Sequence, residues 1–530
     1  MKINKILIVL LLVISCGTDK NEENLSKVFR YNEHSNIRTL DPAFAKDQAH
    51  IWAINQVFSG LVKMDYDLNI VGDIADSWTI SEDGLLYEFQ IREGVLFHDN
   101  ICFSDNIQRE VNAEDFVFSL NRLRSSELAA PGSWVMSNVK GIKSLDKRVL
   151  QIELEKPFPP FLSLLAMKYC SVVPEEAVQY YKEDFGLNPV GTGPFYFKIW
   201  APNVKLVLRK NSSYYQMDSD GSQLPKLEAV SIGFLPDKQS EFLEFLQGNL
   251  DMISGLDPSY KDEILSPIGD LNAIYQKDYT LLKGPFLNTE YLGINTQMDG
   301  PLQFKEVRQA LNSGFDRKKM MTYLRNNVGV AGESGIIPSG LPGYTGETFY
   351  TYDPLKSRKI ISEFKQKYPE VDWSLTLSTN SQYVDLCEFI QKQWESLGIA
   401  VQVEVLPPST LRQSKATGKL SMFRASWIAD YPDAENYLSL FYSSNFAPNG
   451  PNYTYFKNDV YDGLYEQIIR DTRRDSRVAT YQKMDSLIMS EAPIVPLYYD
   501  EFIRVIPKQI KGMKIDALNG LDLRFVEKLR

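Results

Sequence analysis

A cation, an aromatic ring and two carboxylates occur close together in the segment RASWIADYPDAENYL, at residues 424–438. Arg424 and Asp430 are six residues apart, with Trp427 midway between them and Asp433 just after. Six extended residues reach at most about 20 Å, whereas a dipeptide to tetrapeptide spans roughly 7–13 Å. Since burying an unpaired charge costs several kcal/mol, Arg424 and Asp430 could hold the two ends of a short zwitterionic peptide.

A structural alternative applies to the same residues. Arg424 and Asp430 could form a salt bridge with each other at the end of a strand. Asp433 is expected to cap the helix that follows it. The chemistry of the pair therefore allows either a ligand clamp or an internal ion pair.

Motifs for catalysis are not found in the chain. It has no GxSxG, HExxH or Walker A segment. Its three histidines, His34, His50 and His98, are not paired at helical spacing, which disfavours a metal site. GTGPFY at 191–196 lacks the third glycine of a dinucleotide fingerprint and predicts a tight turn before a strand. We therefore expect no enzyme activity, no metal and no cofactor.

The composition places limits on size and partners. A chain of 530 residues exceeds the roughly 250–300 residues of a single core, so two or three domains are expected. A net charge of −11 argues against a nucleic-acid binder, which usually has a basic surface.

The N-terminus predicts export and lipid anchoring. Lysines 2 and 5 precede an apolar run from Ile6 to Ile14, which is shorter than the about 20 residues that span a bilayer. This pattern is typical of a secretory signal peptide over 1–15. The run ends in Val-Ile-Ser-Cys, which resembles a bacterial lipobox and implies lipidation of Cys16. Residues 16–25 are expected to be a flexible tether.

Three further cysteines are Cys102, Cys170 and Cys387. An odd number allows at most one disulfide among them. We interpret them as mostly buried, small apolar residues, and the sequence leaves open whether any two are bonded.

Apolar periodicity predicts strands that alternate with helices, which favours an α/β protein. Asn112 and Ser240 are expected to be helix N-caps and Gly60 a helix stop. The predicted strands are 27–33, 85–97, 149–158, 204–215, 229–236, 373–380, 399–406, 421–428 and 494–506. The predicted helices are 47–62, 112–124, 240–253, 303–324, 382–398, 433–442 and 478–493.

A series of segments resembles one family in order along the chain. They include IRTLDPAFA at 37–45, the stretch from Val57 to Asn100, PVGTGPFYF, FKEVRQALNSGFDRKKM and SWIADYPDAENYL. The family is that of the extracytoplasmic solute-binding proteins of peptide and nickel ABC importers, the oligopeptide- and dipeptide-binding group. The likeness spans nearly the whole mature chain, and residues 101–110 look like an insertion.

The resemblance implies a periplasmic-binding-protein-like α/β fold, with two lobes around a hinge, an extra inserted domain and a ligand cleft between the lobes. Two chain crossings between the lobes would form the hinge. The implied divisions are domain I at 26–59, 191–283 and 497–530, domain II at 60–190, and domain III at 284–496.

The resemblance also implies roles for individual residues. Asp430 is expected to hold the α-ammonium of a peptide, Arg424 the carboxylate of short peptides, and Trp427 to line the cleft. Gln48 and its neighbours are expected to offer groups to the ligand backbone. Trp134 is a weaker candidate for a cleft aromatic.

The function that follows is a lipid-anchored, non-enzymatic, monomeric component of an ABC importer, located in the bacterial cell envelope outside the cytoplasm. It would capture short peptides and deliver them to the permease. Two alternatives remain open. The same fold could bind another small solute, such as an oligosaccharide or a metal chelate, since fold does not fix function. A surface hydrolase is the second alternative.

Overall fold

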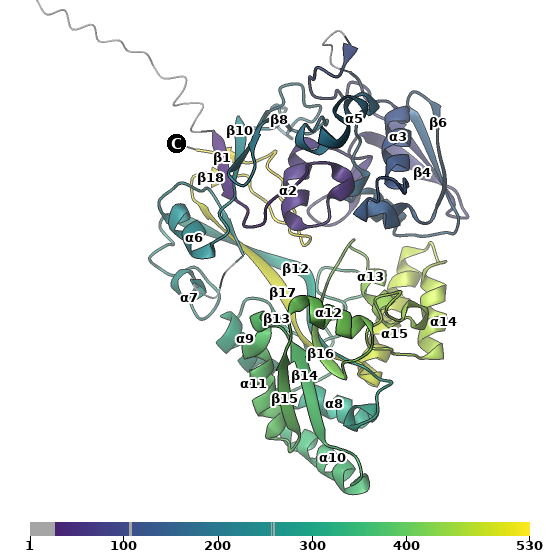
Figure 1. Ribbon diagram of the computed structural model, residues 1–530, viewed down its shortest axis with the longest axis vertical. Helices are drawn as coiled ribbons and strands as arrows, with labels where there is room; N and C mark the ends of the chain where they lie inside the picture. Colours follow the sequence, from purple (N-terminus) through teal and green to yellow (C-terminus); the bar gives the residue numbers. More distant parts are fainter. Residues whose placement is uncertain (1–26, 105–108, 256, 258–259, 530) are drawn as a thin grey trace, which may run out of the picture.

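The computed structural model describes residues 27–104, 109–255, 257 and 260–529 (Figure 1). The expected signal peptide, the tether and Cys16 lie outside these residues, as does part of the expected insertion at 101–110. Figure 1 shows an upper and a lower lobe connected by the two long strands β12 (Tyr279–Ile294) and β17 (Ile494–Pro507).

One sheet of the upper lobe is assembled from distant parts of the chain. Its order is β1 (Val28–Asn32), β10 (Ala229–Gly233), β9 (Lys205–Lys210) and β8 (Phe195–Ala201). β1 pairs in parallel with β10. The helix α2 (Gln48–Val57) buries Trp52 and Ile54 in the same core as Phe29 of β1. The turn predicted at 191–196 precedes β8, as expected.

A second sheet of the upper lobe is continuous in sequence. Its order is β4 (Ala75–Ile80), β5 (Leu86–Ile91), β7 (Val149–Leu154) and β6 (Val139–Asp146). The helix α3 (Ala113–Leu123) packs on β6 and β7. Buried side chains of both sheets, such as Phe29 and Leu150, belong to one hydrophobic cluster. The segment 60–190 is therefore attached to the first sheet by a shared core.

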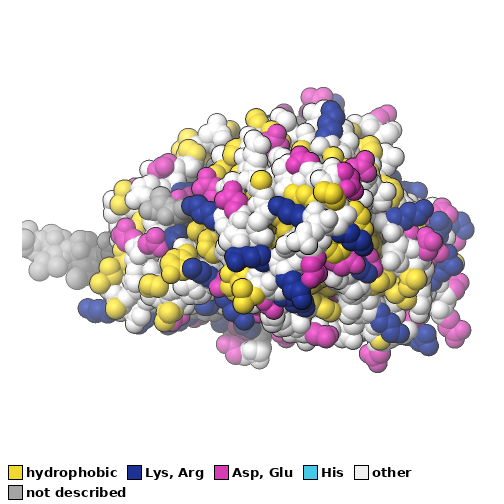
Figure 2. All heavy atoms as spheres, turned by 90° about the horizontal axis from the view of Figure 1, so that it is seen from below, with side chains coloured by type: hydrophobic (Ala, Val, Ile, Leu, Met, Phe, Trp, Pro, Cys, Tyr) yellow, Lys and Arg dark blue, Asp and Glu magenta, His cyan; other side chains and the backbone are white. Residues whose placement is uncertain are grey.

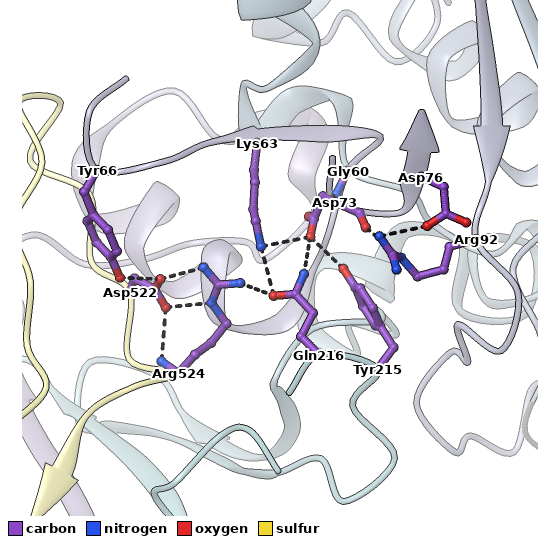
Figure 3. A network of polar contacts seen from close by, with 10 residues as sticks. All are labelled: Gly60, Lys63, Tyr66, Asp73, Asp76, Arg92, Tyr215, Gln216, Asp522 and Arg524. Atoms are coloured by element: carbon purple, nitrogen blue, oxygen red, sulfur yellow. Dashed lines mark hydrogen bonds and ion pairs between the residues drawn. The ribbon is translucent and has the colours of Figure 1, made fainter. Parts of the chain in front are cut away.

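Polar contacts reinforce this attachment where the C-terminal segment meets the small hairpin of β2 (Val62–Met64) and β3 (Ile70–Gly72) (Figure 3). Gln216 and Tyr215 donate to Asp73 Oδ1 at 2.8 and 2.7 Å. Lys63 donates to Gln216 at 2.9 Å, and Arg524 contacts the same amide oxygen. Arg524 also binds Asp522 at 2.6 Å. Three distant segments are thus held together by one partly buried network.

The strands β12 and β17 run antiparallel through the waist of the molecule. Their pairing extends from Tyr279 opposite Pro507 to Gly293 opposite Ile494. The register shifts between Pro285 and Thr289, because proline lacks the N–H that a ladder requires. The expected domain boundaries at 283/284 and 496/497 both fall inside these continuous strands. The lobes are therefore joined by hydrogen-bonded strands rather than by free loops.

The lower lobe contains the sheet to which β12 and β17 contribute. Its order is β11 (Ile253–Ser254), β17, β12, β16 (Met422–Ile428), β14 (Ser374–Thr379) and β15 (Ala400–Val405), with β13 (Val330–Ala331) paired to β17. β14 and β15 are parallel and are connected by α11 (Val384–Glu395), which buries Trp394 in the lobe's core. The mixture of parallel strands with crossover helices confirms the predicted two-lobe α/β class.

Further elements cover the two lobes. Those next to the strands at the waist are α6 (Lys238–Leu246) and α7 (Lys261–Ile264). The upper lobe also has α4 (Phe161–Leu165) and α5 (Glu175–Tyr181). The lower lobe has α8 (Lys305–Ser313), α9 (Arg317–Arg325), α10 (Pro354–Lys367), α12 (Pro408–Ala416), α13 (Glu435–Leu438), α14 (Asp459–Ile468) and α15 (Arg474–Glu491). A short pair, β18 (Ile510–Lys511) and β19 (Glu527–Lys528), lies near the C-terminus.

The starts and ends of several helices differ from those that the local sequence predicts. Asn112 caps α3 and forms a capping box with Asp115, as predicted. The prediction of Ser240 as a cap is wrong, because Asp237 caps α6 and accepts a hydrogen bond from the Ser240 amide. α2 ends at Val57, before the expected stop at Gly60. The single helix predicted over 303–324 is two helices, because Asp316 caps a new one, α9.

Surface features of the described part of the chain are unremarkable for a globular protein. Figure 2 shows acidic and basic side chains interspersed over the lower face. Among the described residues, no helix combines the length and the apolar character needed to cross a bilayer. Cys102, Cys170 and Cys387 are all free thiols, and the last two are buried.

Candidate functional site

The candidate site begins on β16, which pairs with β12 on one side and β14 on the other. The alternation in MFRASWI produces a strand with Phe423 and Ala425 in the core of the lower lobe. The chain leaves the strand after Ile428 and reaches α13 at Glu435. Asp430 therefore lies in the connection at the end of a strand, which is where ligands bind in open α/β sheets.

Arg424 has an internal counterion on the neighbouring strand. Its Nη2 lies 2.5 Å from Oε2 of Glu290 on β12, and both side chains are buried. Its guanidinium carbon is 3.3 Å from the ring centroid of Tyr383. Burial alone would lower the pKa of Arg424, but the Glu290 carboxylate raises it by stabilising the charged form. Arg424 is therefore held as a cation, with Nε buried and without a hydrogen-bond partner.

Asp430 does not pair with Arg424. The structure therefore contradicts the alternative in which these two residues form a salt bridge with each other. The residue Asp430 is exposed, but the protein around it desolvates its carboxylate and raises the pKa of that group. A hydrogen bond from Asn436 lowers the pKa and partly opposes this effect. No ion pair with Asp430 is present among the described residues. This carboxylate is thus open to a cation from outside the protein.

Asn436 holds Asp430 and Trp427 in a common arrangement. Its Oδ1 accepts from the indole Nε1 of Trp427 at 2.8 Å and from the amide of Asp430 at 3.2 Å. Trp427 is half-buried and packs against the core of the lower lobe. Asn436 is a positioning residue that sequence reasoning missed. The only local signal was its place six residues after Asp430, in the first turn of the predicted helix.

Asp433 has a structural role, and only part of it was expected. Its Oδ1 accepts from the amide of Glu435 at 2.9 Å, although the N-cap position of α13 is Ala434. The same carboxylate pairs with Arg477 and accepts from the Tyr481 hydroxyl at 2.7 Å. The predicted N-cap position is therefore wrong by one residue, because α13 begins at Glu435 and the cap position falls on Ala434, although the Asp433 carboxylate still accepts from the first amide of the helix.

The two lobes meet beside Asp430. Phe158 of the upper lobe lies edge-on to Tyr431 of the lower lobe, with ring centroids 6.3 Å apart. Burial raises the pKa of Tyr169 to about 12, and the charges of Asp430 and Asp47 add to this effect. Asp430 therefore directly precedes a residue that contacts the opposite lobe, and its charge and that of Asp47 both act on Tyr169 of the upper lobe.

A cavity of about 670 Å³ opens between the lobes on the side of β12 and β17. Gln48 and Trp52 of α2 line it from above, and Arg325 and Asp500 from below. Gln48 is the first residue of α2, and its side-chain amide donates to the Asn519 carbonyl at 3.1 Å. Trp52 Nε1 donates to the same carbonyl at 2.8 Å.

A chain of polar contacts connects the cavity to Arg424. Asn288 donates to Glu290 and to Asp500, both at 3.3 Å. Asp500 in turn pairs with Arg325 at 2.7 Å. Arg424 and Glu290 are therefore connected to the lower wall of the cavity by a chain of buried and partly buried polar contacts. Sequence reasoning missed Glu290, although a lone carboxylate in the otherwise uncharged stretch NTEYLGIN was a signal.

Lys415 lies near Arg424, and burial together with that positive charge lowers the pKa of Lys415 to about 8. Trp134 is 40 % exposed in a turn at Pro131–Met136 and does not line the cavity between the lobes. Among the described residues, no three His, Cys, Asp or Glu side chains are grouped as metal ligands.

Known proteins resemble the chain over most of its length. The Glutathione-binding protein GsiB of Salmonella typhi is 24% identical over 494 residues, covering 91% of this chain and 90% of the relative. The Dipeptide-binding protein of Escherichia coli is 24% identical over 471 residues, covering 85% and 84%. The structure of HbpA2 from Haemophilus parasuis superposes with a TM-score of 0.84 at 22% identity, covering 95% of this chain and all of that one.

The family assignment rests on a sequence model of the bacterial extracellular solute-binding proteins, family 5, which matches residues 69–449. This match covers more than half of the chain and includes β16, Asp430 and the strand β12. It confirms the resemblance that the sequence segments indicated. The chain therefore belongs to family 5 of the bacterial extracellular solute-binding proteins.

Proposed function

We propose that this protein is the peptide-binding component of an ABC importer and that Asp430 holds the α-ammonium of the bound peptide. The observation that supports it is a carboxylate that has no ion pair among the described residues, is desolvated by the protein around it, and lies next to Tyr431, where the two lobes meet. A desolvated carboxylate gains most from a fully charged partner that also donates hydrogen bonds. The α-ammonium of a peptide is such a partner.

The names of relatives support a peptide ligand. One relative is a dipeptide-binding protein and another a glutathione-binding protein. Their alignments cover 91% and 85% of this chain, so the cleft between the lobes is the region to compare. The absence of a metal-ligand group among the described residues gives no support for direct metal binding.

Arg424 has a more restricted part in the proposal. Because Glu290 already neutralises it, a peptide carboxylate would have to share the guanidinium with Glu290. We therefore propose that Arg424 contributes to carboxylate binding only for the shortest peptides, and that Trp427 lines the cleft between the two charges. Gln48 is proposed to contact the ligand from the upper lobe.

Closure of the lobes would complete the site. The proposed domains are 26–59, 191–283 and 497–530 for domain I, 60–190 for domain II, and 284–496 for domain III. β12 and β17 cross between them, so bending at the register shift after Pro285 is a structural basis for a hinge. Ligand binding would shift the population toward the closed form.

Anchoring and delivery also belong to the proposal. Cys16 is proposed to carry a lipid that holds the monomeric protein at the outer side of a membrane, where it passes the peptide to the permease. The support is the short apolar run before Val-Ile-Ser-Cys. Partitioning of a Cys16→Ser variant into detergent tests this part, and unchanged partitioning would contradict it.

The central test is calorimetric titration with Ala-Ala-Ala, a dipeptide and glutathione. The Asp430→Asn variant should bind the best of these about 30-fold or more weakly, since truncating a buried charge pair costs about 2–5 kcal/mol. N-acetylation of the peptide should have a similar effect on the wild type, and the two losses should not add.

The matched control is Asp76→Asn, which removes an exposed carboxylate paired with Arg92 on the upper lobe. This variant should bind as the wild type does. If none of the peptides binds, the proposed function fails. If Asp430→Asn binds within about threefold of the wild type, the role of Asp430 is refuted even though peptide binding stands.

A further inference from the structure

The cavity between the lobes carries more acidic than basic groups. Its lining includes six carboxylates, those of Glu33, Asp47, Glu241, Asp385, Asp500 and Glu501. The permanent cations in the same lining are Lys261 and Arg325. An enclosed space with an excess of one charge focuses the field on its contents. The contents of this cavity are therefore expected to be positively charged.

Some of these carboxylates already have a cation. Glu241 pairs with Lys238 at 2.9 Å and Asp500 with Arg325 at 2.7 Å, and the Asp47 carboxylate contacts Nδ1 of the His50 ring at 2.5 Å. Lys261 pairs with Asp262, outside the cavity lining, at 2.8 Å. Among the described residues, the carboxyl groups of the lining that have no ion pair are those of Glu33, Asp385 and Glu501.

Glu33 is the least satisfied of the three. It follows β1 and is only 6 % exposed, and its Oε1 is buried without a hydrogen-bond partner. A buried polar oxygen without a partner costs free energy. By contrast, Glu501 accepts from the Gly329 amide at 2.9 Å and Asp385 from the Leu386 amide at 2.8 Å. Glu33 is therefore a vacant acceptor in the wall of the cavity.

We propose that this cavity binds a basic group of the solute, a guanidinium or an ammonium such as the side chain of Arg or Lys in a peptide, with Glu33 as its acceptor. This inference rests on the proposed function and adds a specificity to it. The cavity adjoins the polar chain that leads through Asn288 and Glu290 to Arg424, so a peptide in the cleft could place a side chain there.

The remaining lining suits a long basic side chain. Phe286 and Phe502 line the cavity and provide apolar surface for a methylene stem. A metal ion is a poorer fit, because the carboxylates among the described residues do not converge as a metal-ligand group. An organic cation, with several donors spread over its head group, matches dispersed acceptors.

Binding of a cation at this site should be coupled to the release of a proton from Glu33. Burial raises the pKa of Glu33 to about 8, and repulsion from Glu241 is the second cause. Lys238 on α6 opposes this rise, whereas Asp47, which precedes α2, adds to it. Arg504 and Tyr31 lie on the other side, and His34 is adjacent. Glu33 is therefore mostly protonated at pH 7 in the free protein. A bound cation would lower its pKa and release a proton.

The test uses Ala-Ala-Ala and its derivatives with Lys, Arg, norleucine or Glu at each of the three positions. At one position the Lys or Arg peptide should bind about 10-fold or more tightly than the norleucine peptide, as expected for a hydrogen bond to a charged group. Glu33→Gln should remove most of this preference, measured as the ratio of the affinities for the basic and the norleucine peptide at that position. Glu82→Gln, at an exposed glutamate of the upper lobe, is the matched control and should keep it.

Calorimetry in buffers of different ionisation enthalpy gives a second readout. The wild type should release a fraction of a proton on binding the basic peptide at pH 7, and Glu33→Gln should release none. Equal affinity of basic and norleucine peptides at every position overturns the inference, although peptide binding would stand. A preference that survives in Glu33→Gln overturns the role of Glu33. If no peptide of the series binds, the proposed function fails as well.

Discussion

The guanidinium of Arg424 donates to the carboxylate of Glu290 across the adjacent strands β16 and β12, with Nη2 and Oε2 2.5 Å apart. Both side chains are buried. The cation that the sequence suggests as a ligand clamp therefore has a permanent partner within its own lobe. Arg424 and Asp430 therefore differ in their surroundings, because Asp430 has no such partner among the described residues.

Breaking the Arg424–Glu290 pair should destabilise the protein. Glu290→Gln leaves a buried cation without its counterion, so the free energy of unfolding should fall by about 3–5 kcal/mol. Combining it with Arg424→Met should recover much of this loss, since a neutral pair needs no compensation. Denaturant titration measures both. The exposed pair of Lys140 and Glu153 supplies the control, and Glu153→Gln should change little. Additive losses in the double variant would contradict the prediction.

Asn436 should affect binding through the residues that it positions. Asn436→Ala removes the acceptor of the Trp427 indole and of the Asp430 amide. Peptide affinity should fall by about 5- to 100-fold, since a lost hydrogen bond to a buried donor costs about 1–3 kcal/mol. The effect should be non-additive with Asp430→Asn, because both changes disable one carboxylate. Titrations of the two single variants and the double variant provide the measurement. Strict additivity would show that Asn436 acts elsewhere.

The contact between the two lobes should contribute to peptide affinity even though it does not involve the peptide itself. Phe158→Leu removes the edge-on ring contact with Tyr431 while keeping an apolar side chain. Such aromatic pairs contribute about 0.5–1.5 kcal/mol, so peptide affinity should fall about 2- to 10-fold. Small-angle scattering with saturating peptide should show a smaller closed fraction. Tyr180→Leu removes a comparable exposed pair on the same lobe and should leave both measurements unchanged.

The network around Asp522 should make stability depend on acid pH. Burial would raise the pKa of Asp522, but Arg524 overrides this and holds it well below the ordinary value. The stabilisation by Asp522 is therefore complete above the unfolded pKa of about 3.9 and is lost as the pH falls below it. Thermal unfolding between pH 2.5 and pH 7 should show this loss. Asp522→Asn should lower stability at pH 7 and flatten the acid slope.

The matched control for the acid slope is Asp76→Asn, at an exposed carboxylate paired with Arg92 near the same network (Figure 3). It should preserve the slope. If Asp522→Asn leaves the slope as steep as in the wild type, other carboxylates cause the acid sensitivity.

Local sequence determined much of the architecture. The alternation of MFRASWI predicts β16, and the polar connection after it places Asp430 at the end of a strand. Asn112 predicts the start of α3, because a cap and the amides that it binds lie within three residues of each other. The ordered motifs indicate the family, and the family model confirms it. These inferences succeed because they depend on neighbours in the chain.

Only the tertiary structure decided which charges meet. Arg424 pairs with Glu290 on β12, a strand that the sequence did not predict because Gly284 and Pro285 interrupt its pattern. The cavity at Glu33 is built from β1, α2, α6 and β17, segments from both ends of the chain and its middle. Strand order and register bring these groups together, and the periodicity of the sequence determines neither of them. The sequence therefore identifies Asp430 at a strand end. The pairing of Arg424 with Glu290, and the lack of an ion pair for Asp430 among the described residues, arise from packing between distant segments.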